Sequence, residues 1–386
     1  MPFYKSLKNA TKRDRDRTIL GIERIREQLT QSNFPRKTSS ETLILGTWNI
    51  RNFDDDRFNY GPRLNESLYY IAEIISRFDV IAVQEVCADL GPLNRLMSIL
   101  GYKYDFILTD VTHSSLGGNQ ERLGFIYDRD KVKFRGVAGE IVLPARLLVE
   151  DGSALKRQFS RTPFGVEFQS NWFKFLFSTV HIYYGNNSVN SPEYARRVDE
   201  INKVAKYLAK EAKASEANHI LVGDFNIIKP GSQGYDALAK NGFQMVRNKE
   251  GSNRDKTKFY DQISFLSRKN ELQFVDPDRD DRVIHFFESV FRDEDFGVYE
   301  PIMLKMIEKK LAKAQKDLDA ATSKTAKKKL NGQIQSLEDA RATTASLREY
   351  YDEWRTFQMS DHMPLWVEIK VDFSGAYLEY LKTYKP

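Results

Sequence analysis

The amino-acid sequence predicts an α/β protein with a four-layer α/β/β/α sandwich, in which two packed mixed β-sheets are flanked by helices. Three observations support this prediction. Short apolar runs, typical of strands covered on both faces, alternate with segments of helical period. Strand runs mixed with helices at these intervals indicate sheets inside and helices outside. The 386 residues, of which 41% are hydrophobic, can bury the sizeable core that such a sandwich needs.

The predicted elements begin with a helix near the N-terminus. Residues 1–40 are expected to form a basic helical extension, because residues 15–30 carry apolar side chains at helical spacing. Two further helices are predicted at residues 63–78 and 192–213. The predicted strands are residues 43–50, 79–86, 121–128, 162–170, 172–185, 219–227, 259–266 and 363–371.

A lysine-rich segment at residues 302–349 interrupts this pattern. Its apolar residues are spaced by three and four, at Leu304, Ile307, Leu311, Ala314, Leu318 and Ala321 and again at Leu330, Ile334, Leu337 and Leu347. This spacing predicts two helices folded back on each other, an antiparallel coiled-coil helical hairpin inserted before the last strand. Such a hairpin could mediate self-association or bind a protein partner.

The net charge of +5 is unevenly distributed. Residues 1–40 contain ten Lys/Arg against four Asp/Glu, and residues 301–349 contain eleven against six, which leaves the remaining chain at about -6. This distribution fits a carboxylate-lined site in the body and basic extensions that approach polyanions. The alternative is that the lysine-rich helices are simply well solvated.

Composition limits the class of protein. The single cysteine, Cys87, excludes an intramolecular disulfide and a cysteine-built zinc site. A mean hydropathy of -0.54 and the lack of a long apolar run argue against a membrane span, and no secretory signal is recognisable at the N-terminus. The sequence therefore predicts a cytoplasmic protein with no membrane partner.

Several predicted strands end in polar residues that an apolar core would reject. They are Asn49, Arg51, Gln84, Glu85, His181, Asp224, Asn226, Asp261, Asp361 and His362. Strand ends in layered α/β proteins converge on a common rim, where ligands bind. Because a buried acid costs on the order of several kcal/mol unless it is paired or metal-bound, several acids at one rim predict a cation.

Taken singly, these residues have plainer explanations. The GDFN segment is compatible with a turn that contains Asx hydrogen bonds, and His181 with a hydrogen-bonded core histidine. The ordered set indicates a site. Its segments are TWNIRNF, DVIAVQEV, GGNQERLGFIYDRDKVKF, FSRTP, TVHIYYG, GDFN, YDQI and SDHMPL.

With these segments, the sequence resembles the endonuclease/exonuclease/phosphatase superfamily, and most closely its deoxyribonuclease I-like branch. The resemblance covers roughly residues 43–300 and 358–372. It implies that residues 41–386 form a catalytic domain of this type, interrupted by the hairpin at 302–349.

The resemblance implies a Mg²⁺-dependent phosphodiester hydrolase, and its nuclease-like segments favour a DNA endonuclease that leaves 5′-phosphate ends by metal-assisted attack of water. A phosphatase or phosphodiesterase of the same superfamily, acting on an inositol phosphate, a phospholipid headgroup or a nucleotide, is the alternative. A binding module with an inactive site is a third interpretation, against which the complete set of acids and imidazoles argues.

Phosphodiester hydrolysis needs a metal ion on the phosphate oxygens, an oriented water and a proton donor or cation for the leaving oxygen. Glu85 is the expected Mg²⁺ ligand, with Asn49 beside it and Asp361 as a further contact. Mn²⁺ can substitute because the ligands are equally hard.

By resemblance, His362 is expected to pair with Asp261, and His181 with Glu121. A carboxylate behind an imidazole fixes the tautomer of the ring and stabilises its protonated form.

The remaining site residues are expected to handle water and phosphate. Asp224 and Asn226 would orient both, while Arg161 and Arg51 would clamp non-bridging phosphate oxygens. The alternative for either arginine is a surface ion pair.

The sequence also departs from the family. Asn119 and Gln120 stand where the family has a DNA-contacting tyrosine, just before the glutamate-arginine pair. The basic segments at 1–40 and 302–349 are expected to replace that contact by binding backbone phosphates.

Overall fold

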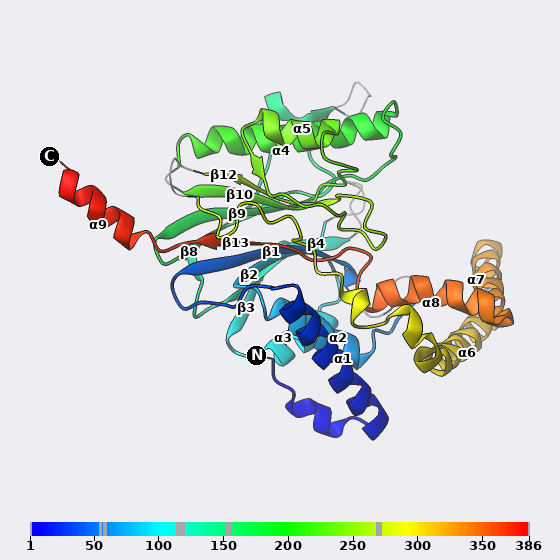
Figure 1. Ribbon diagram of the computed structural model, residues 1–386. Coiled ribbons are helices and arrows are strands. Elements are labelled where there is room, and N and C mark those ends of the chain that lie inside the picture. Colours follow the sequence, from blue (N-terminus) through cyan, green and yellow to red (C-terminus); the bar gives the residue numbers. More distant parts are fainter. Residues whose placement is uncertain are drawn as a thin grey trace.

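Two β-sheets pack face to face in the computed structural model, which describes residues 2–53, 56, 60–112, 120–150, 156–215, 217–267 and 272–384 (Figure 1). Within these residues the strand orders are β13-β1-β2-β4-β3 in the first sheet and β11-β12-β10-β9-β8-β5 in the second. Strand β1 runs parallel to β2, and β9 parallel to β10, while the other pairs are antiparallel. Both sheets are therefore mixed, as predicted.

The strands of the first sheet are β1 (Thr42–Phe53), β2 (Val80–Cys87), β3 (Tyr104–Leu108), β4 (Glu121–Asp128) and β13 (Leu365–Lys370). Those of the second are β5 (Lys133–Glu140), β8 (Phe164–Ser170), β9 (Phe173–His181), β10 (Asn218–Asp224), β11 (Gln244–Met245) and β12 (Asp261–Leu266). A two-stranded ribbon pairs β6 (Val149–Glu150) with β7 (Lys156–Arg157). All the predicted strands are present, and β3 and β5 are among those that the sequence analysis missed.

Helices cover the outer face of each sheet (Figure 1). The first sheet is covered by α1 (Lys12–Gln31), α2 (Asn65–Ile75) and α3 (Gly91–Leu100), and the second by α4 (Pro192–Ala212) and α5 (Gln233–Lys240). Side-chain caps start two of these helices, since Thr11 accepts from the backbone N of Asp14 and Ser191 from that of Tyr194. The four-layer α/β/β/α prediction is confirmed.

The N-terminal helix is packed on the body. Ile25 and Leu29 of α1 are buried in the core beneath the first sheet. Arg17 pairs with Glu66 and Arg26 with Glu73, both on α2. Two of the basic residues of this segment therefore hold the helix in place.

The inserted segment forms three helices, α6 (Phe296–Ala320), α7 (Lys324–Ala342) and α8 (Thr344–Gln358), on one side of the sandwich (Figure 1). The prediction of two helices within 302–349 was incomplete, because a new helix begins after Thr343. Thr343 has an extended backbone and its side chain accepts from the backbone N of Ser346, which together end α7 and start α8. Leu347 consequently belongs to α8.

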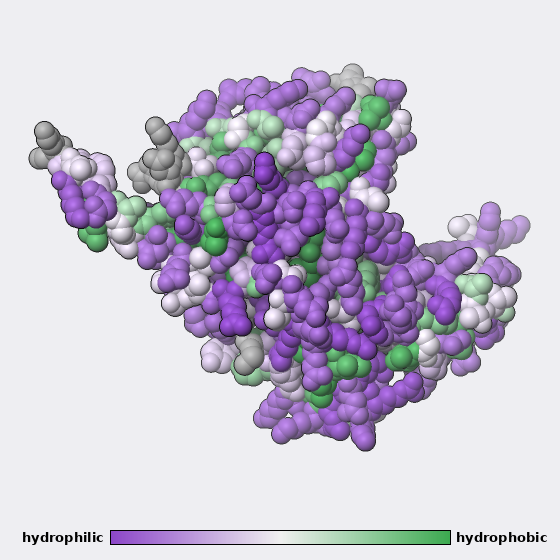
Figure 2. Space-filling model, in the orientation of Figure 1, coloured by the Kyte–Doolittle hydropathy of each residue, from purple (hydrophilic) through white to green (hydrophobic). Residues whose placement is uncertain are grey.

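The last helix, α9 (Ser374–Thr383), projects from the body, and the face of the molecule seen in Figure 2 is largely hydrophilic. Among the residues that the structure describes, no helix combines the length and the apolar character needed to span a membrane.

One buried histidine gives a test of the packing. His219 of β10 is 2% exposed, and neither of its ring nitrogens has a hydrogen-bond partner among the described residues. Burial lowers the pKa of His219 below its ordinary value. The folded protein therefore resists protonation of this ring, whereas the unfolded chain accepts the proton below a pH of about 6.5.

We predict that His219→Leu reduces the loss of stability on acidification. Above the unfolded pKa, neutral His219 adds no pH dependence to the free energy of unfolding. Below that pKa the protein loses stability as the pH falls, by up to about 1.4 kcal/mol per pH unit. Urea unfolding at pH 7.5 and 5.5 should show a smaller decrease in the free energy of unfolding for the variant than for the wild type. Equal decreases would contradict this account of the site.

Candidate active site

Alternation along the strands brings the polar strand ends together. Successive side chains of a strand point to opposite faces, so every second residue faces the other sheet. On β9 the inward residues are three phenylalanines followed by Thr179 and His181. The same apolar-to-polar order ends with Asn49 on β1, Gln84 on β2 and Asp224 on β10; on β4 and β12 the polar residue comes first, as Glu121 and Asp261.

A polar layer separates the apolar core from this rim. The side chain of Gln84, which is fully buried, donates from Nε2 to Thr179 Oγ1 at 2.8 Å and to Thr47 Oγ1 at 3.1 Å. The first of these hydrogen bonds joins the two sheets directly. Because all three side chains are satisfied by one another, they can be buried at little cost.

Asp224 lies at the centre of the rim. Its Oδ2 is 3.1 Å from Nδ2 of Asn49, 3.5 Å from Nε2 of His181 and 3.7 Å from Nε2 of His362, and its Oδ1 accepts from the backbone N of Asn226 at 2.9 Å. Burial would raise the pKa of Asp224, but His362 and His181 outweigh it and keep the pKa below its ordinary value. The carboxylate is therefore ionised.

His362 and Asp261 form the first acid–imidazole pair. Nδ1 of His362 lies 2.8 Å from Oδ2 of Asp261, which also accepts from Ser252 Oγ at 2.6 Å. Burial would lower the pKa of His362, but Asp261 and Asp224 raise it well above its ordinary value. The two acids therefore favour the protonated form of this ring, which presents Nε2 to Asp224.

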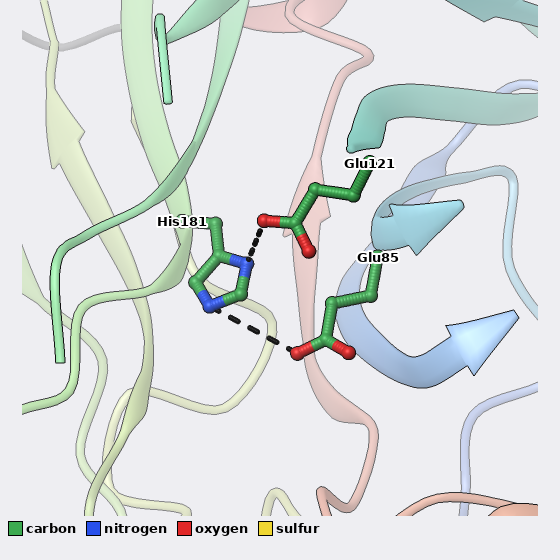
Figure 3. A group of neighbouring side chains, drawn as sticks. All are labelled: Glu85, Glu121 and His181. Atoms are coloured by element: carbon green, nitrogen blue, oxygen red, sulfur yellow. Dashed lines mark ion pairs between the residues drawn. The ribbon is translucent and has the colours of Figure 1, made fainter. Parts of the chain in front are cut away.

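His181 and Glu121 form the second pair, with Nδ1 of His181 2.8 Å from Oε1 of Glu121 (Figure 3). The Arg161 guanidinium contacts the same carboxylate oxygen. Burial would raise the pKa of Glu121, but His181 and Arg161 lower it to about 2. Burial and Arg161 lower the pKa of His181, but Glu121 and Asp224 raise it by more, so that the pKa lies above its ordinary value. Arg161 is thus engaged in a largely buried ion pair inside the site, which is not the surface ion pair noted above, and its contact with a phosphate stays a prediction.

Glu85 reaches the site through an irregular backbone. Strict alternation would direct its side chain away from the face that Gln84 occupies. Glu85, however, has φ +61°, and the register of β2 shifts at this point against both of its neighbours, β1 and β4. Its Oε1 lies 3.9 Å from Nε2 of His181 (Figure 3). The same Oε1 accepts from Asn49 Nδ2 at 2.9 Å, and Oε2 accepts from the backbone N of Asn52 at 2.8 Å. Backbone strain of this kind is characteristic of functional sites.

Comparison with known proteins agrees with this geometry. A sequence profile described as "Endonuclease/Exonuclease/phosphatase family" matches residues 46–262, more than half of the chain. The chain belongs to the endonuclease/exonuclease/phosphatase family. The resemblance to this superfamily is confirmed, and with it the activity class of the family, hydrolysis of phosphate esters. The deoxyribonuclease I-like branch stays a prediction.

One of the solved structures that resemble this chain shows the same fold. An endonuclease/exonuclease/phosphatase family protein from Bacteroides thetaiotaomicron is 16% identical, with 86% of this chain and 99% of that chain covered and a TM-score of 0.50. The mannosyl-6-phosphatase Bt3783 of the same organism is 20% identical, with coverages of 60% and 87% and a TM-score of 0.45. A truncated TDP2 from Caenorhabditis elegans is 15% identical, with coverages of 60% and 87% and a TM-score of 0.41. No curated protein sequence matches the chain.

The rim offers oxygen ligands for the divalent metal that this family typically uses. Oδ1 of Asn49 is buried and has no hydrogen-bond partner among the described residues, and it belongs to the amide that contacts the Glu85 carboxylate. An unpaired buried oxygen beside a carboxylate fits a hard cation, which both oxygens would coordinate. Two sets of three side chains also bring possible ligand atoms within 4.8 Å of one another. One set is Glu85, Glu121 and His181, and the other is Asp224, Asp261 and His362. In both groups the imidazole is already paired with an acid.

Two predicted residues lie elsewhere. Arg51 pairs with Glu353 at 2.6 Å, contacts the Thr356 hydroxyl and lies over the Phe357 ring, all on α8. Asp361 is 42% exposed in its side chain and lies 3.8 Å from Arg51, outside both candidate ligand groups. Arg51 is therefore ion-paired with α8 in this structure, and its contact with a phosphate and the metal contact by Asp361 both stay predictions.

Asn226 has a structural part in the turn after β10. Its Nδ2 donates to the carbonyl of Ile182 at 2.9 Å, and its backbone has φ +53°. Asn119 lies outside the described residues.

Three residues at the site were not predicted. Ser252 supports Asp261, Ser360 donates to the carbonyl of Asn49 at 2.6 Å, and the Tyr260 ring stacks on His362 with a centroid distance of 5.5 Å. Tyr260 and Ser360 stand directly beside the motif residues, which is a local signal. Ser252 precedes Asp261 by nine residues and gives none.

We predict that Glu85→Gln and Asn49→Ala each weaken Mn²⁺ binding by at least about tenfold, because loss of even an outer partner of a metal costs about 10- to 100-fold. Titration followed by electron paramagnetic resonance of free Mn²⁺ measures this without any substrate. Glu353→Gln is the matched control, since it removes a carboxylate that lies on α8 and should leave the Kd unchanged. Unchanged affinity in Glu85→Gln would exclude Glu85 as a ligand.

Proposed function

We propose that the protein is a Mg²⁺-dependent phosphodiesterase that cleaves nucleic acid, specifically a DNA endonuclease. One observation carries the proposal, namely that the ionised Asp224 carboxylate faces two imidazoles, each backed by its own acid. This arrangement concentrates two imidazole donors and one carboxylate acceptor where a phosphodiester can be bound and hydrolysed.

The roles follow from the charges. Glu85 and Asn49 would hold Mg²⁺, which would neutralise charge on a phosphate oxygen. Asp224 accepts a hydrogen bond from the attacking water and orients it. As the water oxygen bonds to phosphorus, the water gives a proton to the Asp224 carboxylate and the P–O3′ bond breaks. The leaving O3′ oxygen takes a proton from a protonated imidazole, for which His362 is the candidate.

The position of the inserted helices supports a polyanionic substrate. Helix α8 runs directly into the segment that carries Ser360 and His362, so the insertion borders the rim. The loop and first turns of α7 expose four lysines, Lys324, Lys327, Lys328 and Lys329. These lysines are available to bind backbone phosphates that extend beyond the reacting one. The N-terminal segment contributes less to this proposal, since Arg17 and Arg26 are paired with acids of α2. Self-association through 302–349 stays a prediction.

We predict that the protein nicks supercoiled plasmid only when Mg²⁺ is present, and that His362→Ala lowers kcat by about 10²- to 10⁴-fold because a general acid is lost. Gel electrophoresis of plasmid over time measures the rate, with His219→Leu as a control histidine outside the site. A parallel assay of phosphate release from inositol phosphates and nucleotides tests the other activity of the family. Phosphate release without nicking would refute the nuclease proposal.

We predict that replacing Lys324, Lys327, Lys328 and Lys329 with Gln weakens DNA binding and flattens its salt dependence. Each lost phosphate contact reduces the slope of log K against log salt by about 0.9 for duplex DNA. Anisotropy titrations of labelled DNA from 50 to 200 mM salt should give a slope smaller by at least about one unit.

A matched variant controls for net charge. Lys206, Lys210, Lys213 and Lys240, all exposed on or beside α4 and α5, lie in the opposite outer layer (Figure 1). Their replacement with Gln should lower the slope of log K against log salt less than replacement of the four α7 lysines does. If the two quadruple variants lower the slope equally, the lysines of the insertion act only through the net charge of the protein, which would contradict the proposed phosphate contacts.

A further inference from the structure

An exposed tyrosine stands fixed beside the candidate site. Tyr184 follows β9, three residues after His181, and is 46% exposed. Its hydroxyl accepts from Asn187 Nδ2 at 3.1 Å. The Arg197 guanidinium covers its ring at 5.2 Å from the centroid. An exposed aromatic ring is ordinarily free to change rotamer, but this one is held on one face and at its tip.

Arg197 is the reason that this loop has one conformation. The side chain, 1% exposed and carried by α4, donates to the carbonyls of Tyr183, Tyr184, Asn186 and Asn226 and to Oδ1 of Asn187. Burying a guanidinium is costly unless its N–H groups are satisfied, and here loop acceptors satisfy them. The same side chain thereby ties the Tyr184 loop to the turn that follows Asp224.

A second ring connects Tyr184 to the reacting groups. The Tyr260 ring meets Tyr184 edge-on, with centroids 6.3 Å apart and an interplanar angle of 88°. Tyr260 in turn stacks on His362 at 5.5 Å and 29°. The three rings form a continuous path from the exposed surface to the imidazole that faces Asp224.

Nothing in hydrolysis itself requires this exposed ring. The proton donors, the central carboxylate and the metal ligands are all supplied by other residues. A fixed, exposed aromatic face one ring away from His362 is, however, a surface on which a planar group can stack with little loss of side-chain entropy.

We propose that Tyr184, supported by Tyr260, is a stacking subsite for the nucleobase next to the scissile phosphate, so that the preferred substrate has unpaired nucleotides. This inference rests on the proposed nuclease function. Bases in a duplex are already stacked on their neighbours, whereas a base in a single strand or an unpaired segment presents a free face to an aromatic ring.

The test compares two oligonucleotides of equal length and charge, oligothymidylate and its base-free tetrahydrofuran analogue. Loss of one base–aromatic stack costs about 5- to 150-fold in affinity. Tyr184→Ala should therefore raise KM for oligothymidylate by about tenfold or more with little change in kcat. It should alter cleavage of the base-free analogue less than twofold, and Tyr184→Phe should behave like the wild type. Tyr102→Ala, which removes a tyrosine that is 79% exposed before β3, is the control.

Equal losses on the two substrates, or no loss on either, would overturn the subsite. If the wild type cleaves neither substrate, the nuclease proposal fails and the subsite is tested by binding alone. Anisotropy with fluorescein-labelled oligothymidylate should then show at least about tenfold weaker binding to Tyr184→Ala than to the wild type, and competition by the base-free analogue should be unaffected. Equal affinity of the two proteins for oligothymidylate would reject the subsite in that case as well.

Discussion

The structure depends on how one buried charge is accommodated. Asp224 is 2% exposed, and an ionised carboxylate in such a position would be strongly destabilising if it were alone. Asn49 comes to it from the first sheet, His181 from the neighbouring strand and His362 from the segment before β13. Each histidine is in turn stabilised in its charged form by a second acid. The charges are thus mutually dependent, and removing one partner leaves the others in an unfavourable environment.

The packing of the two sheets makes this arrangement possible. Between the sheets, phenylalanine and aliphatic side chains fill the core up to the layer of Gln84, Thr47 and Thr179. Beyond that layer the inward positions become ionic. The transition occurs at the same level in both sheets. The packed apolar core therefore fixes the distance between the sheets, and this distance holds the charged side chains of the rim close enough to interact.

The sequence was informative wherever burial alternates with exposure along a strand. The strands with apolar runs were predicted, and so were the residues at their ends, because a polar residue after such a run is conspicuous. Strand β5 was missed because all eight of its residues are exposed and no apolar periodicity marks it. The inward turn of Glu85 was beyond pattern analysis as well, since regular alternation assigns it to the opposite face.

Contacts between distant segments were the other limit. Nothing in the sequence indicated that Arg51 pairs with Glu353, which lies 302 positions further along the chain. Ser252 gives no local indication that it holds Asp261. Such pairs depend on tertiary packing, which a single sequence does not reveal. The third helix of the insertion, by contrast, was within reach, because the Thr343 cap is a local signal.

The continuity of α8 with the segment that carries His362 means that the insertion is not a detachable accessory. Its last turn anchors Arg51, and a few residues later the same backbone supplies Ser360 to the carbonyl of Asn49. A partner that displaced the outer helices would also displace the imidazole of His362, because only a few residues of backbone separate His362 from the end of α8. A variant without the three helices would likewise need a linker that keeps the direction of the backbone leading into β13.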